Sequence, residues 1–134
     1  MNSDTIAAIA TAYGMGSISI IRLSGAKSLE IALALTKRTA LQPRYATLSN
    51  IYDSHANLLD EAILIYFQGP RSFTAEDIVE IQCHGGFIVA QSILKAVLAK
   101  GARLAEPGEF SKRAFFNGRI DLSEAEAIAK LIEA

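Results

Sequence analysis

Long apolar runs and paired cysteines are missing from this sequence of 134 residues. No apolar stretch approaches the roughly 20 residues of a membrane-spanning helix. The first residues lack the basic start and apolar core of a secretory signal. The single cysteine excludes an internal disulfide and suits a reducing compartment. We therefore expect a cytoplasmic protein that does not associate with membranes.

The signatures of several catalytic classes are also absent. No P-loop of the form G-x-x-x-x-G-K-[ST] occurs, so this chain alone should not hydrolyse a nucleotide. With two histidines and one cysteine, no ligand spacing supports a metal centre, and no Ser/His/Asp arrangement supports a nucleophilic site. The formal net charge of −1 gives no general attraction for nucleic acid.

The residues that are present predict one globular α+β domain. A composition of 51% hydrophobic and 20% charged residues is typical of a folded chain, and this length supports a single core. Apolar alternation predicts strands at 5–10, 18–23 and 78–83, a hairpin within 46–67, and a short strand at 102–105. Helical spacing predicts helices at 24–37, 87–100 and 107–118, and a last helix with a capping box at Ser123 and Glu126. Hairpins mixed with helical crossovers predict a mixed β-sheet with flanking helices.

The strand at 78–83 carries the most informative pattern. Alternation places Ile78, Glu80 and Gln82 on one face and apolar residues on the other. Burying an unpaired carboxylate costs several kcal/mol, so Glu80 requires either water or a dedicated partner. Two interpretations remain open. The segment is an edge strand with one wet face, or Glu80 binds a ligand that carries two adjacent N–H groups.

Other polar features favour simpler interpretations. Cys83 and His84 are neighbours on a strand and point to opposite faces, which favours a core cysteine over a nucleophile with its base. The glycine turn at 13–17 favours a hairpin over a phosphate loop. The His84–Gly86 segment suits an anion site or a tight turn equally. Between 95 and 119, six basic residues face two acidic ones, which indicates a solvated helix face or, as the less favoured alternative, an RNA contact.

Six local motifs follow one another along the chain. They are DTIAAIAT at 4–11, IIRLSG at 20–25, GPRSFTAED at 69–77, EIQCHGG at 80–86, RLAEPGEFSKRAF at 103–115 and NGRIDLSEAEAI at 117–128. In this order they resemble the N-terminal region of one family, the bacterial tRNA-modification GTPases called MnmE or TrmE. The resemblance covers essentially the whole chain, and its motifs are specific in combination.

The resemblance implies a domain organisation. Residues 1–118 correspond to an N-terminal folate-binding and dimerisation domain, and 119–134 to the first helix of a truncated helical domain. The family's GTPase domain, with its GTP, magnesium and potassium, lies outside this sequence. The N-terminal domain is expected to resemble the tetrahydrofolate-binding domain of glycine-cleavage T-protein. A sequence that stops within an amphipathic helix fits a segment of a longer protein.

The family's folate contacts carry over to Arg22, Glu80 and Arg119. The last is commonly Lys in the family, and Arg keeps the charge but changes reach and geometry. The Tyr13–Gly16 turn departs from a Pro-Pro-Gly-x-Gly pattern that relatives often show. A pterin presents a 2-amino group and a ring N–H side by side, which a carboxylate can accept together. The implied ligand is 5-formyl- or 5,10-methylene-tetrahydrofolate.

The resemblance also implies partners. The domain is expected to form a homodimer and, in the full assembly, to work with a flavin-dependent protein of the MnmG (GidA) family on the wobble uridine of certain tRNAs. The alternative function is a structural dimerisation module without functional ligand binding. A third interpretation, less favoured because of the overall charge, is direct tRNA binding by the basic C-terminal third.

Overall fold

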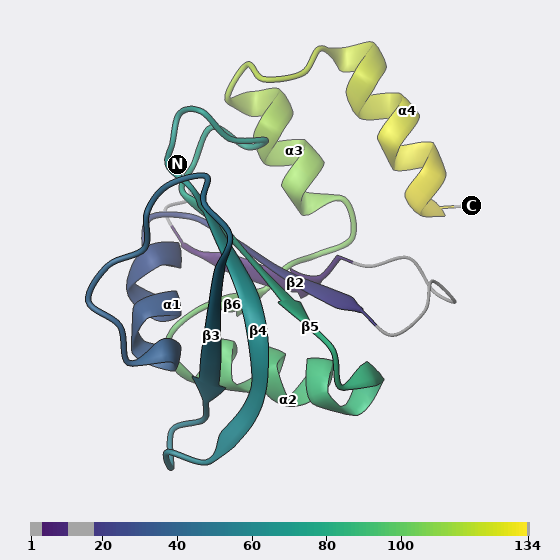
Figure 1. Cartoon of the computed structure of the whole chain (residues 1–134). Helices are drawn as coiled ribbons and strands as arrows, with labels where there is room; N and C mark the ends of the chain where they lie inside the picture. The colour runs from purple at the N-terminus through teal and green to yellow at the C-terminus, as the bar shows by residue number, and fades with distance from the viewer. Residues whose placement is uncertain (1–3, 11–17, 134) are drawn as a thin grey trace.

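A computed structural model describes residues 4–10 and 18–133, and this part of the chain folds around one mixed sheet (Figure 1). The strands are β1 (Ile6–Ile9), β2 (Ser19–Ser24), β3 (Thr47–Tyr52), β4 (Leu58–Phe67), β5 (Ile78–Cys83) and β6 (Arg103–Leu104). The helices are α1 (Ser28–Thr36), α2 (Gly86–Ala99), α3 (Glu109–Phe116) and α4 (Leu122–Glu133). The predicted α+β class is confirmed.

The sheet has the order β3-β4-β5-β2-β1-β6. Every neighbouring pair is antiparallel except β1 and β6, which run parallel after the crossover through α2. Strand β5 therefore lies in the interior of the sheet, between β4 and β2, and Glu80 is not on an edge strand. The predicted mixed sheet is confirmed, and the edge-strand interpretation of 78–83 is wrong.

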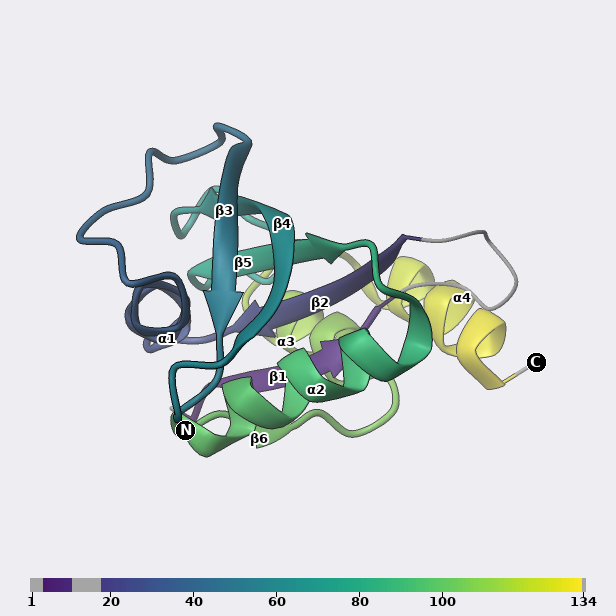
Figure 2. The same ribbon diagram turned by 60° about the horizontal axis from the view of Figure 1, so that its bottom comes forward.

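One face of the sheet forms the main core. The alternate residues Val79, Ile81 and Cys83 of β5 point to this face and are fully buried. Helices α1 and α2 cover it, with Ile31, Leu35, Ile93 and Val97 among the buried residues (Figure 2). Full burial of one such aliphatic side chain stabilises the fold by about 1.5–3 kcal/mol, so this face supplies most of the hydrophobic stabilisation.

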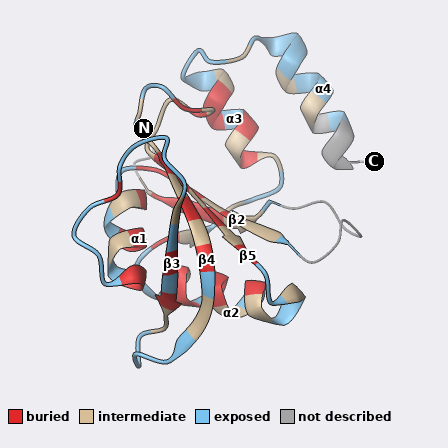
Figure 3. Cartoon of the chain, in the orientation of Figure 1, coloured by how far each residue is buried: buried red, intermediate tan, exposed pale blue. Residues whose placement is uncertain are grey.

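The opposite face is covered only at one end. Ile6, Ser24 and Ile78 form one cross-strand row there and are buried. Two residues further along the strands, the row of Ala8, Arg22 and Glu80 is only partly buried. Figure 3 shows buried residues in α3 and the nearby loop, whereas the described residues of α4 are intermediate or exposed. This opposite face of the sheet, here called the front face, thus changes from covered to open at the Arg22–Glu80 row.

Helix α1 begins four residues later than predicted, at Ser28, with Lys27 as its N-cap residue. Ser24, where the helix was predicted to begin, is instead the last residue of β2 and pairs with Ile78. The turn at Gly25 has φ +138°, and a Cβ there would lie 2.6 Å from Thr5 Cα, so only glycine fits. The Thr5 hydroxyl, just before β1, accepts the Lys27 N–H at 2.9 Å. A contact from a distant part of the chain therefore fixes the turn that leads into α1.

The last helix has a capping box two residues earlier than predicted. Asp121 accepts the backbone N–H of Glu124 at 2.8 Å, and Glu124 accepts that of Asp121 at 3.1 Å. The predicted pair of Ser123 and Glu126 is therefore wrong, because Asp121 precedes the helix and takes the N-cap position.

Two expectations remain at the margins of the fold. The Tyr13–Gly16 turn lies outside the described residues, so its predicted conformation stays a prediction. Among the described helices, none combines the length and apolar character required to cross a bilayer.

Candidate functional site

Arg22 and Glu80 form a direct ion pair in the centre of the partly open face. They are cross-strand partners on β2 and β5, so the antiparallel register brings their side chains together. Arg22 donates to the same carboxylate oxygen, Glu80 Oε2, from Nε at 3.1 Å and from Nη2 at 2.9 Å. The two side chains retain 29% and 18% of their exposure. The pair is accessible to a ligand.

The second oxygen of Glu80 remains available. Both bonds from Arg22 end on Oε2, and among the described residues Oε1 accepts no hydrogen bond. A carboxylate offers about four lone-pair sites. Glu80 therefore keeps acceptor capacity for a ligand with N–H donors while its charge is already compensated by Arg22.

Aromatic and aliphatic side chains flank the pair. The guanidinium carbon of Arg22 lies 5.7 Å from the ring centroid of Phe110, the second residue of α3. On the other side, Ile65 of β4 is the direct cross-strand partner of Glu80, and Ile63 is that of Gln82. Both isoleucines are only partly buried. The site therefore combines one ion pair with apolar surface on which a flat ring could lie.

Arg119, the third predicted site residue, lies in the turn between α3 and α4. It is exposed, and its backbone N–H donates to the Ala114 carbonyl at 2.8 Å. Within the described residues, no hydrogen bond or ion pair joins its side chain to Arg22 or Glu80. The structure thus brings two of the predicted site residues together and leaves the third side chain without a polar contact to them.

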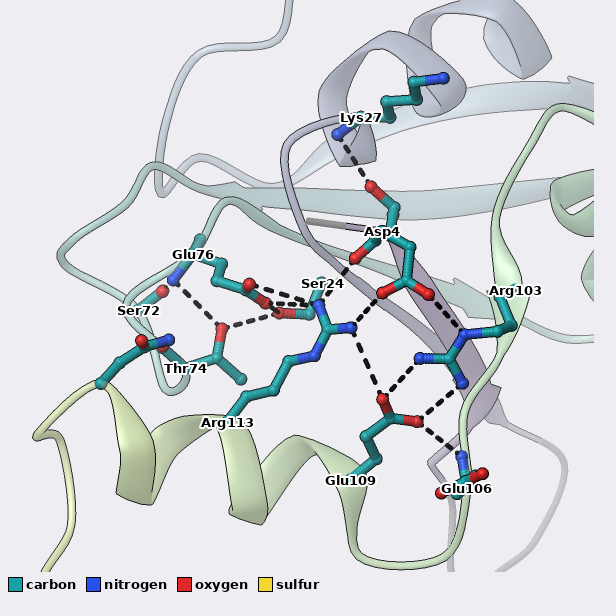
Figure 4. A network of polar contacts seen from close by, with 12 residues as sticks. Asp4, Ser24, Lys27, Ser72, Thr74, Glu76, Arg103, Glu106, Glu109 and Arg113 are labelled. Carbon is teal, nitrogen blue, oxygen red and sulfur yellow. Dashed lines mark hydrogen bonds and ion pairs between the residues drawn. The ribbon is translucent and has the colours of Figure 1, made fainter. Parts of the chain in front are cut away.

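A second and larger ion-pair network fastens α3 to the sheet (Figure 4). Arg113 donates to Asp4 Oδ1 at 2.6 Å and to Glu76 Oε1 at 3.1 Å, and lies 3.5 Å from Glu109 Oε2. Arg103 donates to Asp4 Oδ2 at 2.6 Å and to Glu109 Oε2 at 2.6 Å. The network joins residues far apart in the sequence into one cluster.

Hydroxyl and amide groups extend this network into the loop before β5. The Ser24 hydroxyl donates to Glu76 Oε1 at 2.8 Å and lies 2.7 Å from the Thr74 hydroxyl. Asn117 donates to the Thr74 carbonyl at 2.7 Å. The loop and α3 are therefore held as one unit over the covered end of the front face.

The network shifts the pKa values of its members in the directions that favour their charged forms. The hydrogen bond from Arg103 lowers the pKa values of Asp4 and Glu109. Burial acts to lower the pKa of the Arg113 guanidinium, but its bonds to Glu76 and Asp4 outweigh that effect and the pKa is raised. All three groups are thus held in their charged forms.

This network corrects the interpretation of the basic segment at 95–119 as a solvated helix face for two of its six cations, whereas Lys95, Lys100, Lys112 and Arg119 are exposed. Arg113 is 8% exposed, and both Arg113 and Arg103 are committed to internal ion pairs. Their partner Asp4 is 99 and 109 positions away, so no local pattern could reveal the pairing. Sequence reasoning also missed Phe110, which has the helical spacing of a core residue and carries no distinctive signal.

The other polar candidates have simple roles. Cys83 is fully buried, and burial raises the pKa of its thiol, which confirms a core cysteine. The backbone N–H of His84 donates to Asp60 Oδ2 at 2.8 Å. An internal carboxylate therefore occupies a donor of the His84–Gly86 turn that sequence reasoning considered for an external anion.

Comparison with known proteins identifies relatives along the whole chain. The family described as "GTP-binding protein TrmE N-terminus" matches residues 5–119. The protein of Sulfurimonas denitrificans named tRNA modification GTPase MnmE is 72% identical over 134 residues, which are 100% of this chain and 30% of that protein. The proteins of the same name from Nitratiruptor sp. and Legionella pneumophila are 67% and 54% identical over 99% and 100% of this chain, again 30% of each relative. The chain therefore spans about 30% of the length of these relatives.

Proposed function

The chain belongs to the MnmE (TrmE) family, as its N-terminal domain, and we propose that it is the folate-binding and homodimerisation domain of a tRNA-modification GTPase. The ligand we propose is a reduced folate with a one-carbon group, 5-formyl- or 5,10-methylene-tetrahydrofolate. The chain spans only part of its relatives, so the activity of the whole protein is also part of this proposal. We propose that the whole protein modifies tRNA, that it uses GTP with its metal ions, and that it works with a flavin-dependent partner of the MnmG family. Residues 1–118 would form this domain, and 119–134 would begin the helical one.

The observation that carries the folate proposal is the Arg22–Glu80 pair on the partly open face. Arg22 compensates the charge of the Glu80 carboxylate and leaves one carboxylate oxygen available. That oxygen suits the adjacent ring N–H and 2-amino donors of a pterin. Partly buried isoleucines on β4 and the Phe110 ring provide apolar contacts for a flat ligand. The residues present therefore fit the group. A reduced folate would supply the one-carbon unit, while Glu80 would orient the pterin and Arg22 and Arg119 would hold its carbonyl and carboxylate groups.

The alternative is a purely structural dimerisation module. Exposed apolar side chains support self-association in either case, because Phe87 is 61% exposed, Ile88 80% and Leu104 53%. They line a groove of about 520 Å³ along α2. Since both proposals include a dimer, its molecular mass cannot separate them, whereas ligand affinity can.

The deciding experiment is a calorimetric titration with 5-formyl-tetrahydrofolate. We expect saturable binding near one ligand per chain, and at least tenfold weaker binding in Glu80→Gln, because loss of one charge-assisted bond costs about 1.5–3 kcal/mol. The matched control is Glu30→Gln, which removes an exposed carboxylate from α1 on the opposite side of the sheet. Its affinity should stay within about twofold.

Two results would count against the proposal. Affinity within about twofold in Glu80→Gln would remove Glu80 from the site. Absence of saturable binding to a folded dimer would favour the structural module.

A further inference from the structure

Four exposed cations lie on the surface around β3 without an acidic partner. They are Lys37, Arg38, Arg44 and Arg71, here called the basic row. No ion pair within the described residues involves any of them, whereas Arg22, Arg103 and Arg113 are all paired. The sequence contains no Asp or Glu from 31 to 52 or from 62 to 75, the segments from which these cations come. The basic row therefore presents uncompensated positive charge on a chain whose net charge is −1.

Neutral partners hold three of these cations, Lys37, Arg38 and Arg44, in place. Lys37 Nζ lies 4.1 Å from the ring centroid of Tyr52, and the Arg44 guanidinium lies 5.3 Å from that of Phe67. Ring faces and neutral acceptors orient a cation without cancelling its charge. The cations are thus positioned, and they keep their attraction for an anion.

Hydrogen bonds to neutral oxygens orient the Arg38 and Arg44 side chains in the same way. Arg38 donates to the Ser49 hydroxyl at 3.0 Å and to the Leu48 carbonyl at 3.2 Å. Arg44 donates to the Arg71 carbonyl at 3.2 Å, so these two residues are adjacent in space. Each guanidinium has five N–H donors, and these bonds use at most two of them.

The contact points follow the edge of the sheet. Lys37 is placed at Tyr52, Arg38 at Leu48 and Ser49, and Arg44 at the end of β4, where its N–H donates to Tyr66. Strand β3 is the edge strand, and Figures 1 and 2 show the loop from α1 running beside it. From Tyr52 to Leu48 the strand extends about 13 Å at about 3.3 Å per residue. An elongated array of this kind matches a polyanion better than one isolated phosphate.

An exposed aromatic residue lies at one end of the basic row. Tyr45 is 58% exposed beside Arg44, which provides a surface on which a nucleic-acid base can stack.

Four carboxylates border the basic row. Asp53 and Asp77 lie at its two ends and accept backbone N–H groups. Asp60 and Glu61 of β4 are the cross-strand partners of Ile51 and Asn50, beside the middle of the row. Asp60 accepts a backbone N–H, and within the described residues none of the four carboxylates forms an ion pair with the row.

We propose that the basic row binds the phosphate backbone of RNA along the β3 edge. The RNA class follows from the tRNA of the proposed function, but the contact goes beyond that function because it places RNA on this domain, at a surface separate from Glu80. This proposal differs from the alternative in which the basic C-terminal third binds tRNA. In that segment, two of the six cations at 95–119 already form internal ion pairs.

The test measures binding of the full 134-residue chain to an unmodified tRNA transcript by fluorescence anisotropy at several salt concentrations. The variant Lys37→Gln/Arg44→Gln/Arg71→Gln removes three charges of the row. The matched control Lys95→Gln/Lys100→Gln/Lys112→Gln removes three exposed charges elsewhere. Calorimetry with 5-formyl-tetrahydrofolate accompanies each variant as a separate measure of the pterin site.

The row variant should bind tRNA at least about tenfold more weakly, and its slope of log affinity against log salt should fall by about two to three, because each lost phosphate contact contributes about 0.7–0.9. The control should stay within about twofold, and folate affinity should be unchanged in both. Equal weakening in the control, an unchanged slope in the row variant, or no tRNA binding by the unmodified chain would each overturn the proposal. Row-dependent binding to anionic lipid vesicles without tRNA binding would overturn it in favour of a membrane partner. If the unmodified chain binds tRNA through the basic row but does not bind folate, the result would count against the folate site and leave the assignment of this surface standing.

Discussion

Arg113 and Arg22 lie in the same domain, on the same face of the sheet, and are used in opposite ways. Arg113 is 8% exposed and contacts three carboxylates, those of Asp4, Glu76 and Glu109. Arg22 keeps 29% of its side-chain exposure and contacts one carboxylate oxygen. A structural arginine is surrounded by acceptors on every side. Arg22, in the proposed ligand site, is held from one side and leaves another side accessible.

The difference also separates stability from binding. The Arg113 network joins β1, β6, α3 and the loop before β5, so its loss should loosen all of them. The Arg22–Glu80 pair joins two strands that already share a continuous backbone ladder. Its loss should therefore affect ligand affinity far more than folding. The following predictions test this contrast.

Arg113→Met should have the largest effect on stability. Removing one partner of a buried pair leaves the opposing carboxylates uncompensated, which costs about 3 kcal/mol or more. The free energy of unfolding, measured in urea, should fall by about that amount. Lys112→Met, at the adjacent exposed position, is the control and should change it by less than about 0.5 kcal/mol. Equal effects of the two substitutions would contradict a structural role for Arg113.

Acid should weaken the same network by a smaller amount. Because the folded pKa values of Asp4 and Glu109 are lowered, their contribution is complete above about pH 4, near the unfolded values, and is lost as pH falls through the folded values. The free energy of unfolding should therefore decrease below about pH 4. Glu109→Gln should be less stable at neutral pH and show a shallower decrease in acid. Glu30→Gln should keep the slope of the unmodified chain, and an unchanged slope in Glu109→Gln would refute the assignment.

Glu80→Gln should have the smallest effect on stability. Its partner Arg22 remains partly hydrated, and such exposed pairs contribute about 0–1 kcal/mol. The free energy of unfolding in urea should change by less than about 1 kcal/mol, although folate affinity falls tenfold or more. A loss comparable to that of Arg113→Met would show that the pair is structural and would remove the contrast.

The sequence predicted the elements whose signals are local. The alternation from Ile78 to Cys83 matches β5 at both ends, and it places Glu80 and Gln82 opposite the core as expected. The start of α1 was wrong because the decisive contacts come from elsewhere. Ser24 bonds to Thr74 and Glu76, about 50 positions away, and the Thr5 hydroxyl accepts the N–H of Lys27 at the start of α1.

The candidate site shows the same division. The family resemblance assigned Arg22 and Glu80 to one ligand site, but their direct pairing across β2 and β5 depends on the sheet order and was not predicted. Phe110 and the partners of Arg113 could not be predicted, because helix α3 reaches them only through tertiary packing. Periodicity identifies the face of an element, and it does not identify what packs on that face.

The bonds from Asp4 to Arg103 and Arg113 also have a consequence for synthesis of the protein. During translation, β1 emerges early, yet β6 and the guanidinium groups that compensate Asp4 and Glu76 follow about a hundred residues later. Contacts of such long sequence separation are slow to form, because the intervening chain must be ordered first. A nascent chain stopped before Arg113 should therefore stay incompletely folded on the ribosome. The completed domain can form only when α3 has left the exit tunnel.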